Sequence, residues 1–442
     1  MILSRSSSRS EALLAAGIAL AAALLAVPLA SARAAAGTPP LAKSDRLPGD
    51  DHKWWSGDLV EALRKSGWEP RYFDGTIHVV QEGYHLELAL KALSQPASGL
   101  TVGSFTYRTS PALIAAGREI FRTYHFGTNR FWDFRRAIDY ATELTDPNDY
   151  SRRYGVKRDR DGYFVGLVGV RDAAGHLSYG HACALCHTSE NEAGDLVDGV
   201  PNHDYDIGLY YDALRPKVWD GNLIFLGDAG LDVLRHQGPG RTDPSMDSFW
   251  APVKVPHLFA LRAYEHGYRS NGDTSNIWLQ CYRNLNGEYA VDSEIMEALM
   301  AYLLSLSAPP NSHAVGGIEK KGEGIFRAQG CDRCHSGIYY SNGRVIDWDV
   351  IRTDPDRIRN GFPKGYKVPS LLRVDLAKLL LHDGSLTSLD QLFDPARLKP
   401  DYAAAGIPAE RRKKGAGVQG HEFGLALSIE DRAALVAFLR TL

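Results

Sequence analysis

The chain contains two copies of the pentad Cys-x-x-Cys-His, at Cys183-Ala184-Leu185-Cys186-His187 and at Cys331-Asp332-Arg333-Cys334-His335, which use four of its five cysteines. Two thiols three residues apart can form thioethers with the two vinyl groups of one porphyrin, and the adjacent imidazole can then bind the iron. Zinc ribbons and disulfides also use paired cysteines, but neither needs a histidine directly after each pair. The pattern therefore predicts two covalently attached haem c groups, with His187 and His335 as the proximal iron ligands.

The first residues of the chain resemble an export signal. Arg5 and Arg9 precede the apolar run 12–30, which ends in the small-residue sequence Ala30-Ser31-Ala32. This order is typical of a cleaved secretory signal peptide, which we assign to residues 1–34; a retained membrane anchor is the alternative. No later stretch is long and apolar enough to span a bilayer. We therefore expect a periplasmic protein with no membrane span after cleavage.

Composition limits the partners. The 442 residues are 44% hydrophobic, enough for two or three cores, and the formal net charge at pH 7 is −3. No basic stripe exists that could hold a polyanion. Nucleic acid is therefore excluded as an expected partner.

Comparison of the chain with itself reveals an internal repeat. The matched pieces are 116–122 with 321–327 (both containing Gly-x-x-Ile-Phe), 253–258 with 366–371 (both containing Lys-Val-Pro), and 298–303 with 434–439. The last pair has apolar residues at helical spacing, and the first reads as the helix that enters each pentad. The fold class predicted is mainly α, with two cytochrome c-like helical haem domains in tandem, extra N-terminal segments and an insertion.

Differences between the copies give the expected domain boundaries. They are a signal peptide at 1–34, an N-terminal extension at 35–109, a first haem domain at 110–310 and a second at 311–442. The first domain carries an insertion at about 126–180, with an expected hairpin from Tyr163 to Tyr179. Because a small haem domain has little internal room, we expect these additions to wrap or cap the first haem.

The sixth ligand of each iron decides its role, since a filled site suits electron transfer and an open site can bind an oxidant. His421 lies between glycines that let backbone approach a porphyrin, and we predict that it is the distal ligand of the second iron; a surface-loop histidine is the alternative. The matching position of the first copy holds Leu285, which cannot ligate. The first iron is therefore the candidate for chemistry.

Other histidines carry weaker signals. His203, shortly after the first pentad, could reach the open side of the first iron as a displaceable ligand or an acid–base group, or could be a polar loop residue. His382 stands at a turn where it could contact the second haem or make only structural bonds. His257 flanks the corresponding turn of the first copy and carries no distinct signal.

Two pentads, each followed by Val-Pro-x-Leu and a turn glycine, together with His-Asp-Gly-Ser-Leu-x-x-Leu at 382–389, resemble the bacterial dihaem cytochrome c peroxidase superfamily. This superfamily includes the tryptophan-maturing dihaem enzymes and the rubber oxygenases. The resemblance covers roughly 110–442, and the stretch around His421 is most similar to the rubber-oxygenase branch. It implies that the second haem passes electrons, that the first meets hydrogen peroxide or dioxygen, and that calcium between the domains is a further candidate.

Two features of the family transfer only in part. At the turn where peroxidases have a tryptophan between the haems, this chain has Ser270. Gln280 matches a family glutamine, and Glu288 is the nearest counterpart of the acidic residue that assists O–O cleavage. With His203, which its position after the first pentad suggests, the resemblance thus makes Gln280 and Glu288 the candidate catalytic residues.

The leading hypothesis is a peroxidase that receives electrons through the second haem from a small periplasmic cytochrome c or cupredoxin. The first alternative is an oxygenase that uses dioxygen at the first haem on an apolar organic substrate. The second alternative is a non-enzymatic electron carrier in which His203 is the sixth ligand of the first iron.

Overall fold

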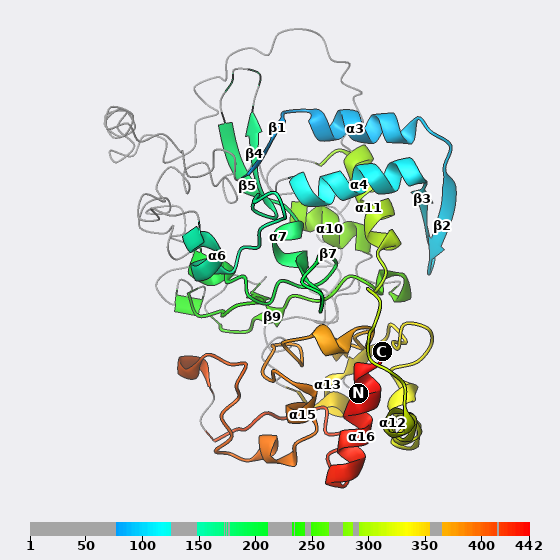
Figure 1. Cartoon of the computed structure of the whole chain (residues 1–442), viewed down its shortest axis with the longest axis vertical. Coiled ribbons are helices and arrows are strands. Elements are labelled where there is room, and N and C mark those ends of the chain that lie inside the picture. The colour runs from blue at the N-terminus through cyan, green and yellow to red at the C-terminus, as the bar shows by residue number, and fades with distance from the viewer. Residues whose placement is uncertain are drawn as a thin grey trace, which may run out of the picture. The chain divides into compact units, whose positions relative to one another are not determined.

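The computed structural model of the chain describes residues 77–124, 148–171, 173, 175, 177–210, 232–233, 235–243, 249–264, 277–285, 291–353, 365–412 and 415–442. The expected signal peptide, most of the N-terminal extension and the start of the insertion lie outside these residues. Figure 1 shows the arrangement of the described elements, coloured by residue number from blue to red.

Before the linker at Pro309 and Pro310, helices alternate with short strands. The elements are β1 (His78–Gln81), α3 (Tyr84–Leu93), β2 (Ser98–Val102), β3 (Phe105–Thr109), α4 (Pro111–Thr123), α6 (Asn148–Tyr154), β4 (Leu167–Arg171), β5 (Leu177–His181), α7 (Ala184–His187), β6 (Thr188–Glu190), β7 (Leu196–Asp198), β8 (Arg241–Thr242), β9 (Val253–Lys254), the 3₁₀ helix η4 (Leu261–Ala263), α10 (Ile277–Leu285) and α11 (Ser293–Ser305).

After the linker, two long helices enclose a loop-rich segment. The elements are α12 (Gly317–Ala328), η5 (Cys331–Arg333), β10 (Val345–Asp347), α13 (Trp348–Ile351), β11 (Gly365–Lys367), η6 (Val374–Leu376), α15 (Leu389–Leu392), η7 (Pro395–Leu398), η8 (Ala409–Arg411) and α16 (Ile429–Arg440). Among the described residues, helices form the packed centre of both parts and the strands are short, which is consistent with the expectation of a mainly α fold.

Helices α4 and α11 pack together in the first part (Figure 1). Helix α4 begins at Pro111, after Ser110 accepts a hydrogen bond from the Leu113 amide at 3.1 Å. A glycine is required where the helices cross, because a Cβ on Gly117 would lie 1.9 Å from the Ala298 carbonyl oxygen. One turn further on, Phe121 meets Tyr302 edge to face at 5.4 Å.

Helices α12 and α16 repeat this arrangement in the second part. A Cβ on Gly322 would lie 2.0 Å from the Ala434 carbonyl oxygen, and Phe326 meets Phe438 edge to face at 5.4 Å. The residues are those that the sequence repeat aligns. The two copies therefore share side-chain contacts as well as sequence.

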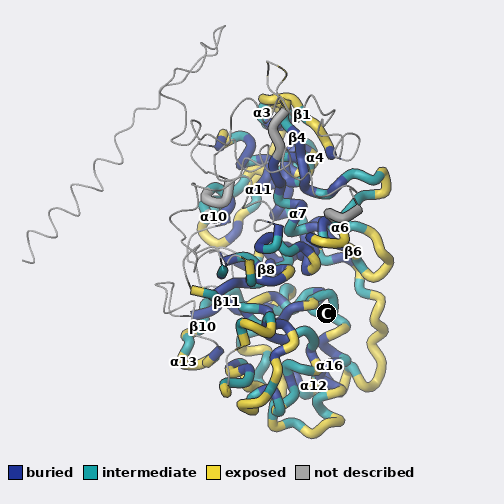
Figure 2. Tube along the Cα trace, turned by 90° about the vertical axis from the view of Figure 1, so that its left-hand side faces the viewer, coloured by how far each residue is buried: buried dark blue, intermediate teal, exposed yellow. Residues whose placement is uncertain are grey.

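The first core also takes in residues from before α4. Helix α3 packs on α4 and α11, and His85 on α3 bonds Thr123 on α4 at 2.9 Å. Helix α11 is buried around nearly its whole circumference, as the colouring in Figure 2 shows. The described end of the N-terminal extension is thus part of the first hydrophobic core.

The expected hairpin is confirmed, because β4 and β5 pair antiparallel from Leu167 with His181 to Arg171 with Leu177. Strand β1 adds to the other edge of β4 in parallel. Backbone from this insertion reaches the first pentad, since a Cβ on Gly166 would lie 2.2 Å from the Leu185 amide nitrogen. Within the residues described, no helix combines the length and apolar character needed to cross a bilayer.

Candidate functional site

The two pentads fold into the same turn. The His187 amide donates to the Cys183 carbonyl at 3.0 Å, and the His335 amide donates to the Cys331 carbonyl at 2.9 Å. All the cysteines are free thiols. Burial raises the pKa of Cys183, raises that of Cys186 to about 12 and raises that of Cys331, so these thiols are protonated at neutral pH.

An asparagine braces each pentad in the same way. The Asn202 amide donates to the Cys186 carbonyl at 2.8 Å, and its side-chain nitrogen donates to Leu185 at 3.1 Å. Asn342 makes the equivalent bonds to Cys334 at 2.9 Å and to Arg333 at 3.2 Å. These braces were not predicted, because the two asparagines follow their pentads at different distances in the sequence.

The Lys-Val-Pro motif contacts the histidine of each pentad. His187 Nδ1 lies 3.2 Å from the Pro256 carbonyl oxygen, and His335 Nδ1 lies 3.1 Å from the Pro369 carbonyl oxygen. A carbonyl only accepts, so each Nδ1 carries the proton and each Nε2 keeps the lone pair that binds a metal. Burial lowers the pKa of His187 to about 4 and lowers that of His335, which keeps both imidazoles neutral at pH 7.

In the second part, His421 faces His335. The two ring centroids are 6.4 Å apart and the ring planes are inclined by 65°. One metal bound by two imidazole nitrogens, each at about 2 Å, would separate the centroids by roughly 6 Å. Burial, with the charges of His335 and Arg397, lowers the pKa of His421 to about 4. The two rings are therefore neutral at pH 7 and lie at the separation that two ligands of one metal ion would need.

A buried arginine fixes the loop that carries His421. Arg397 is 0% exposed and donates to the carbonyls of Val418 at 2.6 Å, Gly420 at 2.8 Å and His421 at 2.9 Å. The His421 backbone has a φ of 47°, in the left-handed region that side chains rarely adopt, and its amide donates to the Ile351 carbonyl at 2.8 Å. Nothing in the sequence around Arg397 marks this role.

His382 lies close to the same loop. It is 7% exposed, its Nδ1 is 3.4 Å from Thr353 Oγ1, and its ring is 4.3 Å from that of Tyr366. Thr353 in turn contacts Gly420, where a Cβ would lie 2.2 Å from the Thr353 amide nitrogen. The structure thus brings His382 beside the His421 loop.

His203 is buried with unsatisfied polar atoms. It is 6% exposed, and neither ring nitrogen has a hydrogen-bond partner among the described residues. Desolvation, with the charge of Lys254, lowers its pKa to about 3, so the ring is neutral at pH 7. It directly follows Asn202, which places it next to the first pentad. A buried neutral imidazole without partners is suited to bind a group that is not part of the polypeptide.

The remaining predicted residues are less well placed. Gln280 lies on α10, but its side chain is outside the described part of the structure, as is Glu288. Leu285 ends α10, and Ser270 is also outside the described residues.

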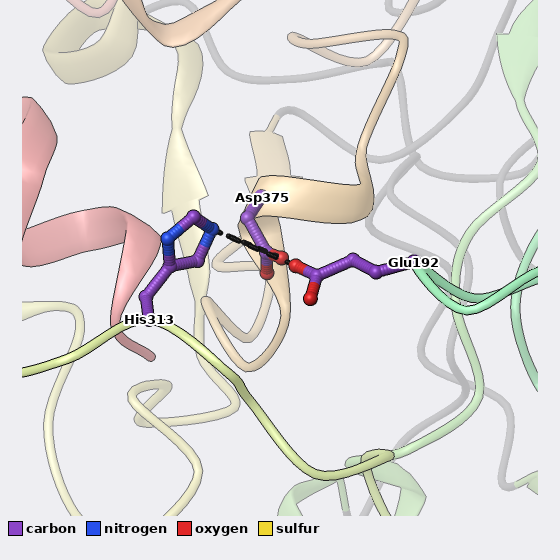
Figure 3. Close-up of side chains that lie close together, drawn as sticks. All are labelled: Glu192, His313 and Asp375. Carbon is purple, nitrogen blue, oxygen red and sulfur yellow. Dashed lines mark ion pairs between the residues drawn. The ribbon is translucent and has the colours of Figure 1, made fainter.

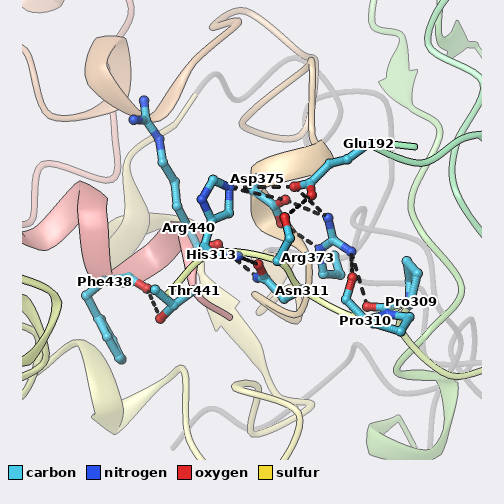
Figure 4. Close-up of polar contacts among 11 residues, drawn as sticks. Glu192, Pro309, Pro310, Asn311, His313, Arg373, Asp375, Phe438, Arg440 and Thr441 are labelled. Carbon is cyan, nitrogen blue, oxygen red and sulfur yellow. Dashed lines mark hydrogen bonds and ion pairs between the residues drawn. The ribbon is translucent and has the colours of Figure 1, made fainter. Parts of the chain in front are cut away.

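Glu192, His313 and Asp375 come together from three separate segments (Figure 3). His313 Nε2 lies 3.6 Å from Glu192 and 4.0 Å from Asp375. Arg373 already binds both carboxylates, at 3.0 and 2.8 Å, and donates to Pro309 and Pro310 (Figure 4). Calcium prefers six to eight oxygen ligands and no competing cation. This cluster therefore fits an ionic contact around the linker better than the calcium site that the family resemblance suggested.

Neither a protein-family model nor a curated protein matches the chain. Among solved structures, the chain is similar to Kuenenia stuttgartiensis hydrazine synthase under xenon pressure, at 14% identity over 78% of this chain and 93% of that one, with a TM-score of 0.38. It is also similar to a MauG-like protein associated with microbial copper homeostasis, at 16% identity over 43% and 75% of the two chains, with a TM-score of 0.33. Both TM-scores are too low to establish a shared fold.

Proposed function

We propose that the chain is a periplasmic dihaem c-type cytochrome with peroxidase-like oxidoreductase activity, related to the bacterial dihaem cytochrome c peroxidases. The observation that carries this proposal is an asymmetry between two otherwise repeated sites. Both pentads have the same turn, the same asparagine brace and the same prolyl carbonyl on the proximal histidine. Among the described residues, a histidine ring faces the pentad histidine only in the second copy, where it is His421, and the sequence repeat aligns that position with Leu285 in the first copy.

The residues present fit two haem groups. Cys183 and Cys186 would hold the first through thioethers and Cys331 and Cys334 the second, with His187 and His335 as proximal ligands and His421 as the distal ligand of the second. The haem irons would supply the one-electron redox chemistry that the polypeptide lacks. The prolyl carbonyls hold each proximal ring in one tautomer and one orientation.

The residues around the first site would assist proton transfer during the reduction of hydrogen peroxide. His203 has no hydrogen-bond partner among the described residues, so its neutral ring would be free to hydrogen-bond hydrogen peroxide and help to orient it for proton transfer. Gln280 and Glu288 are further candidates from the family resemblance. Electrons would enter at the second site from a small cytochrome c or cupredoxin.

Spectra of purified holoprotein test this proposal. We expect two haems by pyridine haemochrome, one low-spin and one high-spin ferric signal, and oxidation of reduced cytochrome c by hydrogen peroxide. A variant with Cys183→Ser and Cys186→Ser should keep only the low-spin haem. Two low-spin haems that do not respond to peroxide would contradict the peroxidase and support the electron carrier.

Oxygenation of an apolar organic substrate is a second candidate. The observation in its favour is that the insertion packs against the first pentad, through Gly166 at Leu185 and through Gly155, whose carbonyl accepts from Asn202 at 3.0 Å. Added segments at this place could form a substrate pocket. Dioxygen consumption that depends on an apolar substrate and needs no added cytochrome c would favour this candidate over the peroxidase.

A further inference from the structure

One side chain links the two Lys-Val-Pro motifs. His257 directly follows Pro256, and Ser370 directly follows Pro369. His257 Nε2 lies 3.2 Å from the Ser370 carbonyl oxygen. Because a carbonyl only accepts, Nε2 carries the proton and donates it across the contact. The residues next to the two prolines that hold the proximal histidines are therefore joined to each other.

We propose that His257 carries electrons between the two haem sites, an inference that rests on the proposed function. The route runs from His335 Nδ1 to the Pro369 carbonyl (3.1 Å), along the backbone to Ser370, across to the His257 ring (3.2 Å), along the backbone to Pro256, and from its carbonyl to His187 Nδ1 (3.2 Å). Every step is a covalent bond or a hydrogen bond. Such a chain couples two redox groups better than contacts through space do.

The surroundings hold both ends of this bridge. The His257 ring stacks on Phe259, with centroids 5.4 Å apart and planes inclined by 21°. On the other side, the Ser370 amide donates to the Tyr264 hydroxyl at 2.8 Å and the Ser370 hydroxyl donates to the Tyr339 carbonyl at 2.7 Å. Ser370 is 4% exposed, so water does not compete for this contact. The bridge is thus a fixed element of the interior.

The electron balance is simple. With haem held at both pentads, each transfer would oxidise the group at His335 by one electron and reduce the group at His187 by one electron. No bond in the bridge would form or break, and the Nε2 proton would stay on His257. Two such transfers would supply the two electrons that, with two protons from solvent, reduce one hydrogen peroxide to two water molecules. The bridge also explains how the chain can do without the tryptophan that peroxidases have at the position of Ser270.

The test measures electron transfer between the haems in holoprotein. Carbon monoxide is bound to the ferrous first haem while the second is ferric, the ligand is removed by a laser flash, and the reduction of the second haem is followed by its low-spin absorption. His257→Asn is too short to reach Ser370, whereas His257→Gln places an amide N–H where Nε2 lies. We expect His257→Asn to slow the transfer about tenfold or more, which corresponds to about 1.4 kcal/mol of barrier, and His257→Gln to stay close to wild type.

The matched control is His85→Asn, which removes another buried Nε2 hydrogen bond, the one to Thr123. It should leave the transfer rate unchanged, and haem content, spin state and both reduction potentials should be the same in all variants. A wild-type rate in His257→Asn, or equal slowing by His85→Asn, would overturn the route while leaving the proposed function intact. Failure to load two haems, or failure of the first to bind carbon monoxide, would instead overturn the proposed function and this inference with it.

Discussion

Replacing Gly322 by alanine should force α12 and α16 apart. The new Cβ would lie 2.0 Å from the Ala434 carbonyl oxygen and 2.8 Å from Phe438 Cβ, whereas ordinary contacts begin at 3.4 Å. The carbonyl belongs to the backbone of a helix and cannot rotate away. To bring the 2.0 Å contact to an ordinary 3.4 Å, the two helices must therefore separate by about 1.4 Å. Overpacking of this kind costs about 1–3 kcal/mol or more. The higher helix propensity of alanine offsets up to about 1 kcal/mol of this loss in stability.

Gly324 offers the matched control on the same helix, because a Cβ there would meet nothing within 4 Å. Gly324→Ala should therefore raise the free energy of unfolding by up to about 1 kcal/mol, while Gly322→Ala should lower it by about 2 kcal/mol. Denaturant unfolding of the full-length holoprotein, followed by circular dichroism, measures both changes. If the two variants are equally stable, the close crossing of the helices is wrong.

Three further perturbations have defined outcomes. His421→Ala should convert the low-spin ferric haem to high spin, with the low-spin spectrum restored by added imidazole; an unchanged spectrum would refute the ligand assignment. Arg397→Met leaves the carbonyls around His421 without donors and should destabilise the protein by roughly 3–5 kcal/mol in thermal unfolding, and a loss below 1 kcal/mol would contradict its clamping role. Although burial raises the pKa values of Asp204 and Glu190, Lys157 outweighs this effect and lowers both. The two carboxylates therefore stabilise the fold above their ordinary pKa of about 4, and this stabilisation is lost as the pH falls through the lowered pKa values. Lys157→Met should be less stable than wild type at pH 7. Denaturant titrations should show that this difference in stability shrinks below about pH 4.

The sequence predicts those features that local chemistry or the repeat encodes. The pentads require Cys and His at fixed spacing, and the sequence repeat aligns Gly117 with Gly322, the two residues at which the structure has the close helix crossings. His421 stood out because glycines flank it, and the structure places its ring opposite His335. Each of these signals lies within a few residues of the chain.

Contacts between distant residues were not predictable in this way. Arg397 binds carbonyls 21 to 24 residues away, and His257 meets a residue 113 positions away. Neither residue has a neighbouring pattern that marks its partner, since the pairing depends on how loops pack after folding. The sequence around His257 therefore does not indicate that this residue joins the two Lys-Val-Pro motifs.

The carbonyls that hold the proximal histidines also set an order of events during biosynthesis. Pro256 lies 69 residues after His187, and Pro369 lies 34 residues after His335. Neither histidine can therefore be held until the later segment that carries its carbonyl has folded back onto the pentad, and the N-terminal pentad depends on the more distant segment. Until that packing forms, both pairs of thiols stay accessible to whatever attaches the porphyrin.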